Sequence, residues 1–379
     1  MERIYFDYAS TTPTDPEVFK AMGPYFYDRF GNPSSPHAFG REAQKALEDA
    51  RAVVAQFIGA QSEEIVFNSG ATEGNNHAVF GIARLLRGKG NHIIVSPIEH
   101  HSVLEPVEHL GKEGWRVSRL SVSAQGLIDP QQVEDSITEQ TVLIAVMLAN
   151  NEIGTIQPVA EVGRIARARN IPFLVDAVQA VGHIPVNVRE LGADLLSLSA
   201  HKFYGPKGVG AFYIRRGVKI FPFLLGGDQE RGRRASTPNV AGAVGLAKAI
   251  ELCRQKMDEE MALQSRLRDQ LFEEIPQRVE GVVINGHRHS RLPNNAHFSF
   301  EKVEGESLLM SLDMEGIAAS MGSACTSGAM EPSRVLRAIG LSDELAFGAL
   351  RLTLGRWTTQ EHIDYLLEQL PKIIKGLRI

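Results

Sequence analysis

Between about residues 37 and 216, amphipathic helical patterns alternate with short apolar runs. In one helix pattern Leu47, Ala50, Val54 and Phe57 recur at steps of three and four, which marks a single buried face. Such alternation is typical of a mostly parallel sheet covered by helices. It predicts helices over residues 72–86, 103–110 and 159–167, and strands over residues 64–68, 92–96, 117–122, 142–148, 172–176, 195–199 and 210–214.

Beyond about residue 260 the pattern changes to longer helices with separate strands, and residues 282–354 contain several glycine-rich loops. We interpret this part as a second, smaller α+β domain. The chain has no internal repeat, no low-complexity tract and no obvious flexible linker. The two domains are therefore expected to pack closely and to share a cleft.

The composition, net charge and cysteine content of the chain exclude several classes of protein and of binding partner. The 379 residues include 40 Lys and Arg and 45 Asp and Glu, a net charge of -5, with 43% hydrophobic residues. Such a chain is not disordered, and no direct nucleic-acid or membrane binding is expected. The start has no apolar signal segment and no run of 18 apolar residues occurs, so cytoplasm is expected. Two cysteines cannot form a disulfide framework or a four-thiolate zinc site, and we expect no metal.

Two polar groups follow neighbouring apolar runs of the predicted sheet. Asp176 ends the run at residues 172–176, and Lys202 follows the run at residues 195–199. Both would lie at carboxyl ends of parallel strands, where open α/β sheets bind ligands. A lysine there can have a lowered pKa, and a lysine with a carboxylate serves pyridoxal 5'-phosphate, as Schiff-base partner and ring-nitrogen partner. Taken singly, the aspartate would more often be a helix cap or ion-pair partner, and the lysine solvated.

Ser69-Gly70-Ala71-Thr72 follows a predicted strand and opens a helix, where free backbone N–H groups and a hydroxyl can bind a phosphate. A plain helix N-cap is the alternative for this motif in isolation. His100 follows the strand at residues 92–96 and would reach the same edge of the sheet. An imidazole there can stack on an aromatic cofactor and move protons, whereas a lone histidine is usually structural.

The two cysteines have different surroundings. Cys325 lies among the small residues of 321–328, which favour an exposed loop and a reactive thiol. A thiolate there could attack a sulfur atom held by the cofactor and then deliver it. Cys253 lies in an apolar helical run and is predicted to be packed. Arg351 alternates with leucines in residues 350–354 and suits a substrate carboxylate, although an exposed strand arginine is the alternative.

Together these motifs resemble the cysteine desulfurases, pyridoxal-phosphate enzymes of fold type I in the class V aminotransferase group. The match runs from Tyr5 to about Gly355. The last of its motifs looks like the branch that includes the nitrogen-fixation and housekeeping iron-sulfur-cluster desulfurases. The matching stretches are residues 6–13 (FDYASTTP), 31–35 (GNPSS), 69–73 (SGATE), 99–100 (EH), 150–154 (NNEIG), 176–179 (DAVQ), 199–202 (SAHK) and 322–327 (GSACTS).

The resemblance implies a large cofactor-binding domain over residues 13–260 and a small domain over residues 1–12 and 261–379, which carries the catalytic-cysteine loop. Lys202 would be the catalytic Schiff-base lysine, Asp176 the partner of the pyridine nitrogen and Gln179 a donor to the ring oxygen. His100 would stack on the ring and handle the thiol proton. Asn151 would also contact the cofactor. The residues that would bind its phosphate are Ala71, Thr72, Ser199, His201 and, from the second subunit of a homodimer, Thr237.

For the substrate, the resemblance implies that Arg351, Asn151 and Asn32 bind the carboxylate and that Cys325 carries sulfur as a persulfide. L-cysteine would become L-alanine, and the sulfur would pass to an acceptor for iron-sulfur cluster assembly or other sulfur-containing biomolecules. A protein acceptor such as a cluster scaffold is expected, although the chain ends at Ile379 without the longer tail that the housekeeping branch uses to engage its scaffold.

Two alternatives stay open. A selenocysteine lyase or another class V aminotransferase-like enzyme would use Lys202 and Asp176 in the same way but would not need Cys325 for sulfur transfer. A non-catalytic sulfur carrier or assembly protein would keep only the fold.

Overall fold

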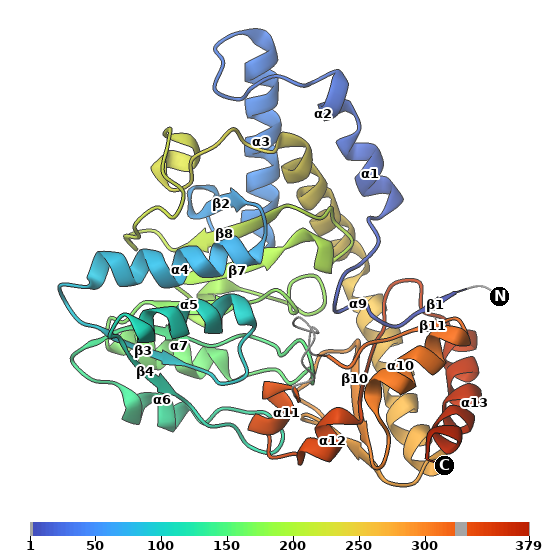
Figure 1. The fold of residues 1–379 in the computed structure, drawn as a ribbon. Helices are drawn as coiled ribbons and strands as arrows, with labels where there is room; N and C mark the ends of the chain where they lie inside the picture. The colour runs from blue at the N-terminus through green and yellow to red at the C-terminus, as the bar shows by residue number, and fades with distance from the viewer. Residues whose placement is uncertain (1–2, 323–331, 379) are drawn as a thin grey trace.

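The computed structural model describes residues 3–322 and 332–378, and its largest sheet has seven strands (Figure 1). They lie in the order β2-β8-β7-β6-β5-β3-β4. Strand β8 is antiparallel to both neighbours, and the other pairings in this sheet are parallel. The bounds are β2 (Ile65–Asn68), β3 (His92–Val95), β4 (Arg116–Arg119), β5 (Thr141–Ala145), β6 (Phe173–Asp176), β7 (Leu195–Ser199) and β8 (Gly210–Ile214).

Neighbouring residues on these strands pack into different hydrophobic cores, one on each face of the sheet. On β5, Ile144 belongs to one core, and Leu143 and Ala145 belong to the other. Because both faces are buried, the inner strands are rich in apolar residues, whereas the edge strand β4 (RVSR) is not. The helical segments of residues 16–232 are α1 (Pro16–Met22), α2 (Pro24–Tyr27), α3 (Ala38–Phe57), η1 (Ser62–Glu64), α4 (Ala71–Leu86), α5 (His101–Lys112), α6 (Pro130–Ser136), α7 (Val159–Ala168), α8 (Val188–Leu191), η2 (Ala200–Lys202) and η3 (Gln229–Gly232).

Both ends of the chain contribute to a separate hydrophobic core, which includes Phe6, Phe298 and Leu350. Strand β10 (Asn295–Phe300) pairs antiparallel with β9 (Val282–Ile284) and with β12 (Ala349–Thr353). Strand β1 (Ile4–Tyr5) pairs parallel with β11 (Ile317–Ala318). The helices of this part are α10 (Gly305–Met314), α11 (Arg334–Ala338), α12 (Asp343–Phe347) and α13 (Gln360–Leu377).

One long helix, α9 (Val240–Arg278), passes from the first of these parts to the second. Leu246 and Ile250, near its start, pack in the core beneath the large sheet. Leu267 and Leu271, near its end, pack in the core of the chain termini. The change of sequence pattern near residue 260 therefore falls inside the continuous helix α9. Before this point the buried residues of the helix pack in one core, and after it they pack in the other.

The predicted fold class is confirmed: the chain is α/β with a mostly parallel sheet of seven strands. The strands over residues 195–199 and 210–214 have the predicted bounds. The strand predicted over residues 142–148 ends at Ala145, although Val146, Met147 and Leu148 are buried, because apolar sequence marks burial rather than strand pairing. Within the described residues, no helix is both long and apolar enough to cross a membrane.

Candidate active site

Asp176 and Lys202 lie at the carboxyl ends of two adjacent parallel strands. Asp176 is the last residue of β6, which pairs with β7, and Lys202 ends the short helix η2 directly after β7. Both residues therefore reach the same edge of the sheet, as the sequence predicted. Asp176 is buried and accepts hydrogen bonds from the side-chain amide of Asn75 (2.8 Å) and the backbone N–H of Val178 (3.0 Å).

A chain of side-chain hydrogen bonds joins Asp176 to His100. The Asn75 amide donates one hydrogen to Asp176 Oδ2 and the other to Ser102 Oγ, at 2.9 Å. Ser102 Oγ lies 2.8 Å from His100 Nδ1, which also accepts the backbone N–H of Ser102. Because Nδ1 is an acceptor, the neutral ring carries its hydrogen on Nε2. The pKa of His100 is lowered by burial and by the nearby Lys202, and raised in part by Asp176.

The amine of Lys202 is held by the N-terminal segment of the chain. Its Nζ donates to the backbone oxygens of Ala9 and Ser10, each at 2.7 Å. Burial lowers the pKa of Lys202 to about 8, and the positive charge of Arg351 adds to this, whereas Asp7 and Asp176 oppose it. A larger fraction of Lys202 is therefore neutral near physiological pH than of an ordinary lysine, and the neutral amine is the nucleophilic form. The side chain of Gln179 donates to the same oxygen of Ala9, at 3.0 Å.

Beside Lys202, the start of helix α4 has the features of a phosphate-binding site. Gly70, the N-cap, has φ of 145°, and no side chain caps the first backbone N–H groups. A Cβ at Gly70 would lie 3.5 Å from Ser199 Oγ, which places the Ser199 hydroxyl beside this helix start. His201 Nδ1 lies 3.1 Å from Thr11 Oγ1, and burial lowers the pKa of His201 to about 4. Uncapped N–H groups with a hydroxyl beside them fit the phosphate of pyridoxal 5'-phosphate.

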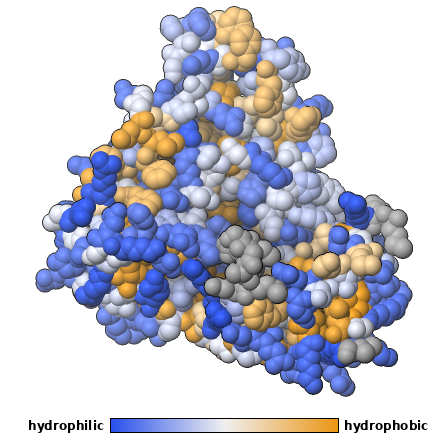
Figure 2. All heavy atoms as spheres, viewed as in Figure 1, coloured by the Kyte–Doolittle hydropathy of each residue, from blue (hydrophilic) through white to orange (hydrophobic). Residues whose placement is uncertain are grey.

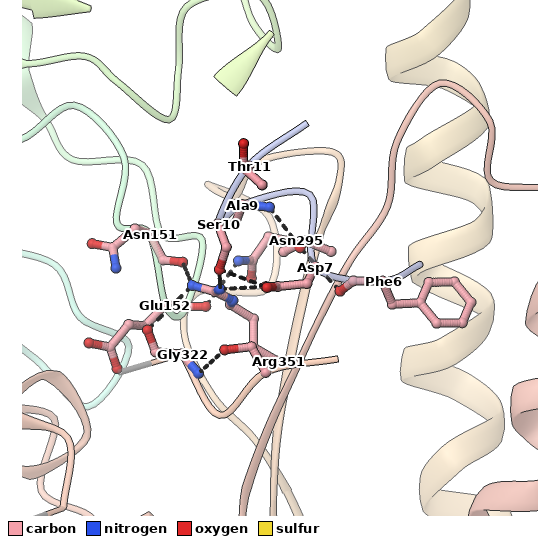
Figure 3. Close-up of polar contacts among 12 residues, drawn as sticks. Phe6, Asp7, Ala9, Ser10, Thr11, Asn151, Glu152, Asn295, Gly322 and Arg351 are labelled. Atoms are coloured by element: carbon pink, nitrogen blue, oxygen red, sulfur yellow. Dashed lines mark hydrogen bonds and ion pairs between the residues drawn. The ribbon is translucent and has the colours of Figure 1, made fainter. Parts of the chain in front are cut away.

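Arg351 lies on β12 with its guanidinium almost fully buried, at 3% exposure of the side chain (Figure 3). Its Nη2 donates to Asp7 Oδ1 and Ser10 Oγ, each at 2.8 Å. Its Nη1 donates to the backbone oxygens of Asn151 (2.8 Å) and Gly322 (3.4 Å). The leucines on either side, Leu350 and Leu352, face the hydrophobic core, so the predicted alternation of this strand is confirmed.

Glu152 lies beside Arg351 and contacts residues on both sides of 323–331. Its carboxyl oxygen accepts from Ser333 Oγ at 2.5 Å, and Gly322 packs against its side chain. Burial raises the pKa of Glu152, although the bond from Ser333 and the charge of Arg351 oppose this. Glu99, next to His100, is also buried, and its pKa is raised well above the usual range by burial and by Asp176. A carboxyl with a raised pKa stays protonated, and so uncharged, at higher pH than usual. Glu152 and Glu99 therefore contribute less negative charge to the site than two ordinary glutamates would.

Some predicted site residues are not brought together within one chain. Asn32 lies in the exposed connection between α2 and α3, at the top of Figure 1, where its side chain accepts the backbone N–H of Ser34. Thr237 is exposed, and no hydrogen bond within the described residues joins it to Lys202 or Asp176. Cys325 lies outside the described residues. Cys253 is buried in α9 as predicted, and burial raises its pKa to about 12.

Comparisons with known proteins place the chain in a family. The family described as Aminotransferase class-V matches residues 4–366. The chain belongs to this family, among its cysteine desulfurases. It is 54% identical to the protein named Cysteine desulfurase IscS of Dictyoglomus turgidum, over 99% of this chain and 95% of that one. The solved structure of a NifS-like protein is 38% identical with a TM-score of 0.93, and the match covers 99% of this chain and all of that one. The structure titled "SspA in complex with cysteine" is 36% identical with a TM-score of 0.83, and the match covers 94% of this chain and all of that one.

Family membership confirms the resemblance drawn from the sequence motifs and the cofactor expected with it, pyridoxal 5'-phosphate. The residues present fit this group: a buried lysine with a lowered pKa, a buried aspartate on the next strand and an uncapped helix start lie at one sheet edge.

Sequence reasoning missed Asn75, Ser102, Asp7 and Ser10 as members of this site. Asn75 is one helical turn beyond the phosphate-binding motif and Ser102 is two residues after His100, so local spacing offered a weak signal for both. Asp7 and Ser10 lie in the matching stretch of residues 6–13 but had no assigned role. Only the tertiary structure places them against Arg351.

Proposed function

We propose that this protein removes sulfur from L-cysteine, releasing L-alanine and holding the sulfur as a persulfide on Cys325. The observation that carries the proposal is the position of Ser10 between two functional groups. Its backbone oxygen accepts from Lys202 Nζ, and its hydroxyl accepts from Arg351 Nη2. The group that reacts with an amine and the group that binds a carboxylate thus contact the same residue. An α-amino acid, with its amine and carboxylate on one carbon, suits both.

When bound, pyridoxal 5'-phosphate supplies an aldehyde that bonds to amines and a ring that accepts electrons. Lys202, with its pKa lowered to about 8, exchanges a proton with the substrate's α-carbon. Asp176 would be the partner of the ring nitrogen, and the hydrogen bonds that it accepts from Asn75 and Val178 hold its carboxylate in place. His100 would stack on the ring and handle the thiol proton at Nε2, because its Nδ1 accepts the backbone N–H of Ser102.

The same assignment gives each remaining residue a role. Gln179 would donate to the ring oxygen, and Ala71, Thr72, Ser199 and His201 would bind the phosphate. Arg351 and Asn151 bind the substrate carboxylate. The Cys325 thiolate then attacks the substrate sulfur: an S–S bond forms, the carbon–sulfur bond breaks with its electron pair on carbon, and that carbon takes up a proton. This requires Cys325 as a free thiol, and therefore a reducing compartment such as the cytoplasm.

The arrangement also favours a homodimer. Thr237 and Asn32 are exposed, and within the described residues no hydrogen bond joins either to Asp176, Lys202 or Arg351, so in the proposed roles they act in the site of a second subunit. Apolar side chains are exposed around α1, α2 and the start of α3, at the top of Figure 2, and would be covered by a partner. They are Phe19, Phe26, Tyr27, Phe30 and Phe39, each more than half exposed.

Mixed dimers test this subunit arrangement. One subunit carries Lys202→Ala and the other carries Thr237→Ala. If Thr237 acts across the interface, one site of the mixed dimer has both native residues, and activity returns to about half of the wild-type value. If Thr237 acts within its own chain, neither site is complete and the mixture stays as inactive as the single variants.

We further propose that the site lies between a large domain (residues 13–260) and a small domain (residues 1–12 and 261–379). Asp176 and Lys202 come from the large sheet, whereas Arg351 comes from β12, whose leucines pack in the core of the chain termini. A protein acceptor, such as an iron-sulfur cluster scaffold, would take the sulfur from Cys325, because a persulfide beside the cofactor must reach a partner too large for the cleft.

The main experiment measures sulfide and alanine from L-cysteine in the presence of a reductant. Equal amounts of both products, lost in the Cys325→Ala variant, are expected. Release of selenide from L-selenocysteine that persists in Cys325→Ala would favour a selenocysteine lyase. Amino transfer from L-alanine to 2-oxo acids without sulfide release would favour an aminotransferase and contradict the proposal.

A further inference from the structure

Every hydrogen of the two terminal nitrogens of Arg351 already has an acceptor (Figure 3). Nη2 donates to Asp7 Oδ1 and Ser10 Oγ, and Nη1 donates to the backbone oxygens of Asn151 and Gly322. The Nε hydrogen is buried and has no acceptor within the described residues. A substrate carboxylate that binds two nitrogens of this guanidinium must therefore displace at least one present partner.

Asp7 differs from the other partners in charge and in accessibility. Of the four groups that accept hydrogen bonds from Arg351, Asp7 is the carboxylate, and its ion pair with Arg351 is 2.8 Å long. The Arg351 side chain is 3% exposed, whereas the Asp7 side chain is 20% exposed and can turn toward solvent. The oxygens of Asn151 and Gly322 belong to the backbone and cannot rotate away alone. Of the two side-chain partners, Asp7 presents the same chemical group as the incoming substrate.

The hydroxyl of Ser10 donates to Asp7 Oδ1 at 2.8 Å, and the turn that carries Asp7 is also held by three hydrogen bonds that do not use this carboxylate. The backbone N–H of Ser10 donates to the Asp7 backbone oxygen at 3.0 Å. The backbone N–H of Ala9 donates to Thr353 Oγ1 at 2.9 Å, and the backbone N–H of Thr353 donates to the oxygen of Phe6 at 2.7 Å. Thus Asp7 can release Arg351 while the turn, and with it the Ser10 and Ala9 oxygens that hold Lys202, stays on β12.

A buried guanidinium needs a counter-charge at all times, because an unpaired buried charge is strongly destabilising. Asp7 supplies one when no substrate is bound. If Asp7 and a substrate carboxylate both remained beside Arg351, two like charges would lie next to one cation, which is unfavourable. An exchange of one carboxylate for the other keeps the local charge constant.

We propose that Asp7 is an internal substitute for the substrate carboxylate, which neutralises and orients Arg351 in the empty site and yields its place when the substrate binds. This inference rests on the proposed function, in which Arg351 binds the carboxylate of an amino acid. Asp7 then sets substrate affinity. A ligand binds well only if its carboxylate competes with the Asp7 carboxylate for Arg351, and Arg351 adds no affinity for a ligand that lacks a carboxylate.

The test uses the holoenzyme and two unreactive fragments of cysteine. 3-Mercaptopropionate keeps the thiol and carboxylate without the amine, and cysteamine lacks the carboxylate. Asp7→Asn keeps the shape and an oxygen that accepts from Arg351 but removes the competing charge. We expect it to bind 3-mercaptopropionate about three- to tenfold more tightly by calorimetry, with cysteamine unchanged. The empty variant should also unfold at a lower temperature, because Arg351 has lost its counter-charge.

Asp7→Glu is the matched control: it keeps the charge and should show no such gain. If Asp7→Asn does not fold, Asp7→Ser, which also lacks the charge, must show the same tightening. Unchanged or weaker binding of 3-mercaptopropionate by Asp7→Asn overturns the inference, because Asp7 would then only orient Arg351 or remain beside the bound carboxylate. A failure of the proposed function is distinguishable, since Arg351→Lys would then leave the affinity for 3-mercaptopropionate unaltered.

Discussion

Asn75 donates a hydrogen bond to the carboxylate of Asp176, and this contact connects the predicted ring-nitrogen partner to His100. The second amide hydrogen of Asn75 goes to Ser102, whose hydroxyl lies against His100 Nδ1. The sequence suggested Asp176 and His100 separately. The structure links them through Asn75 and Ser102, which the sequence did not suggest. The link orients the Asp176 carboxylate and fixes which nitrogen of His100 can exchange a proton with substrate.

Asn75→Ala should weaken binding of pyridoxal 5'-phosphate about tenfold, because the buried Asp176 loses a donor that stabilises its charged form. Equilibrium dialysis against the cofactor measures this. Asn91→Ala, which removes an exposed amide that donates to Gly114, is the control and should bind the cofactor normally. Normal cofactor affinity in Asn75→Ala would contradict the role assigned to this amide.

The amine of Lys202 should titrate near pH 8, since burial and Arg351 lower its pKa to about 8. Only the neutral amine reacts with an aldehyde, so the rate at which the cofactor-free protein takes up pyridoxal 5'-phosphate should rise with pH, reach half of its maximum near pH 8 and level off about one pH unit higher. Absorbance in the near-visible range follows this reaction. Lys202→Ala should show no borohydride-reducible bond to the cofactor. A rate that still rises near pH 10, the range of an ordinary lysine, would contradict the lowered pKa.

Cys325→Ala should bind the cofactor but release no sulfide from L-cysteine. Cys253→Ala should stay active within small factors, because the Cys253 thiol is buried in α9 and donates to the Phe203 backbone oxygen, at 3.7 Å. One addition of L-cysteine without reductant should add one sulfur atom to the peptide that contains Cys325, as measured by mass spectrometry. Extra sulfur on Cys253, or none on Cys325, would refute the carrier role.

Glu230→Ala should lower the free energy of unfolding by about 3–5 kcal/mol, since it leaves the buried Arg51 without its main partner. The side chains of Arg51 and Glu230 are 3% and 4% exposed, and Glu230 also accepts the backbone N–H of Phe67. Glu48 pairs with the same arginine from a side chain that is 39% exposed, so Glu48→Ala should cost at most about 1 kcal/mol. Urea unfolding compares the two. Equal losses would contradict this ranking.

Much of the large sheet could be predicted because its strands are buried on both faces and therefore read as apolar runs. The polar groups at their carboxyl ends, Asp176 and Lys202, followed from the same pattern, since parallel strands bring such groups to one edge. Arg351 was predicted from its alternation with leucines. Its partners were not, because Asp7 lies 344 positions away in the chain and no periodicity relates the two.

The sequence by itself determined the family, the cofactor and the packed position of Cys253, because these depend on which groups are present and on local pattern. Tertiary structure alone decided how these groups are charged and connected. Folding buries Lys202 enough to lower its pKa, places Asn75 between Asp176 and Ser102, and brings the N-terminal turn of Asp7 and Ser10 against β12. Burial and long-range contacts set these properties, and both arise only when segments distant in the sequence pack together.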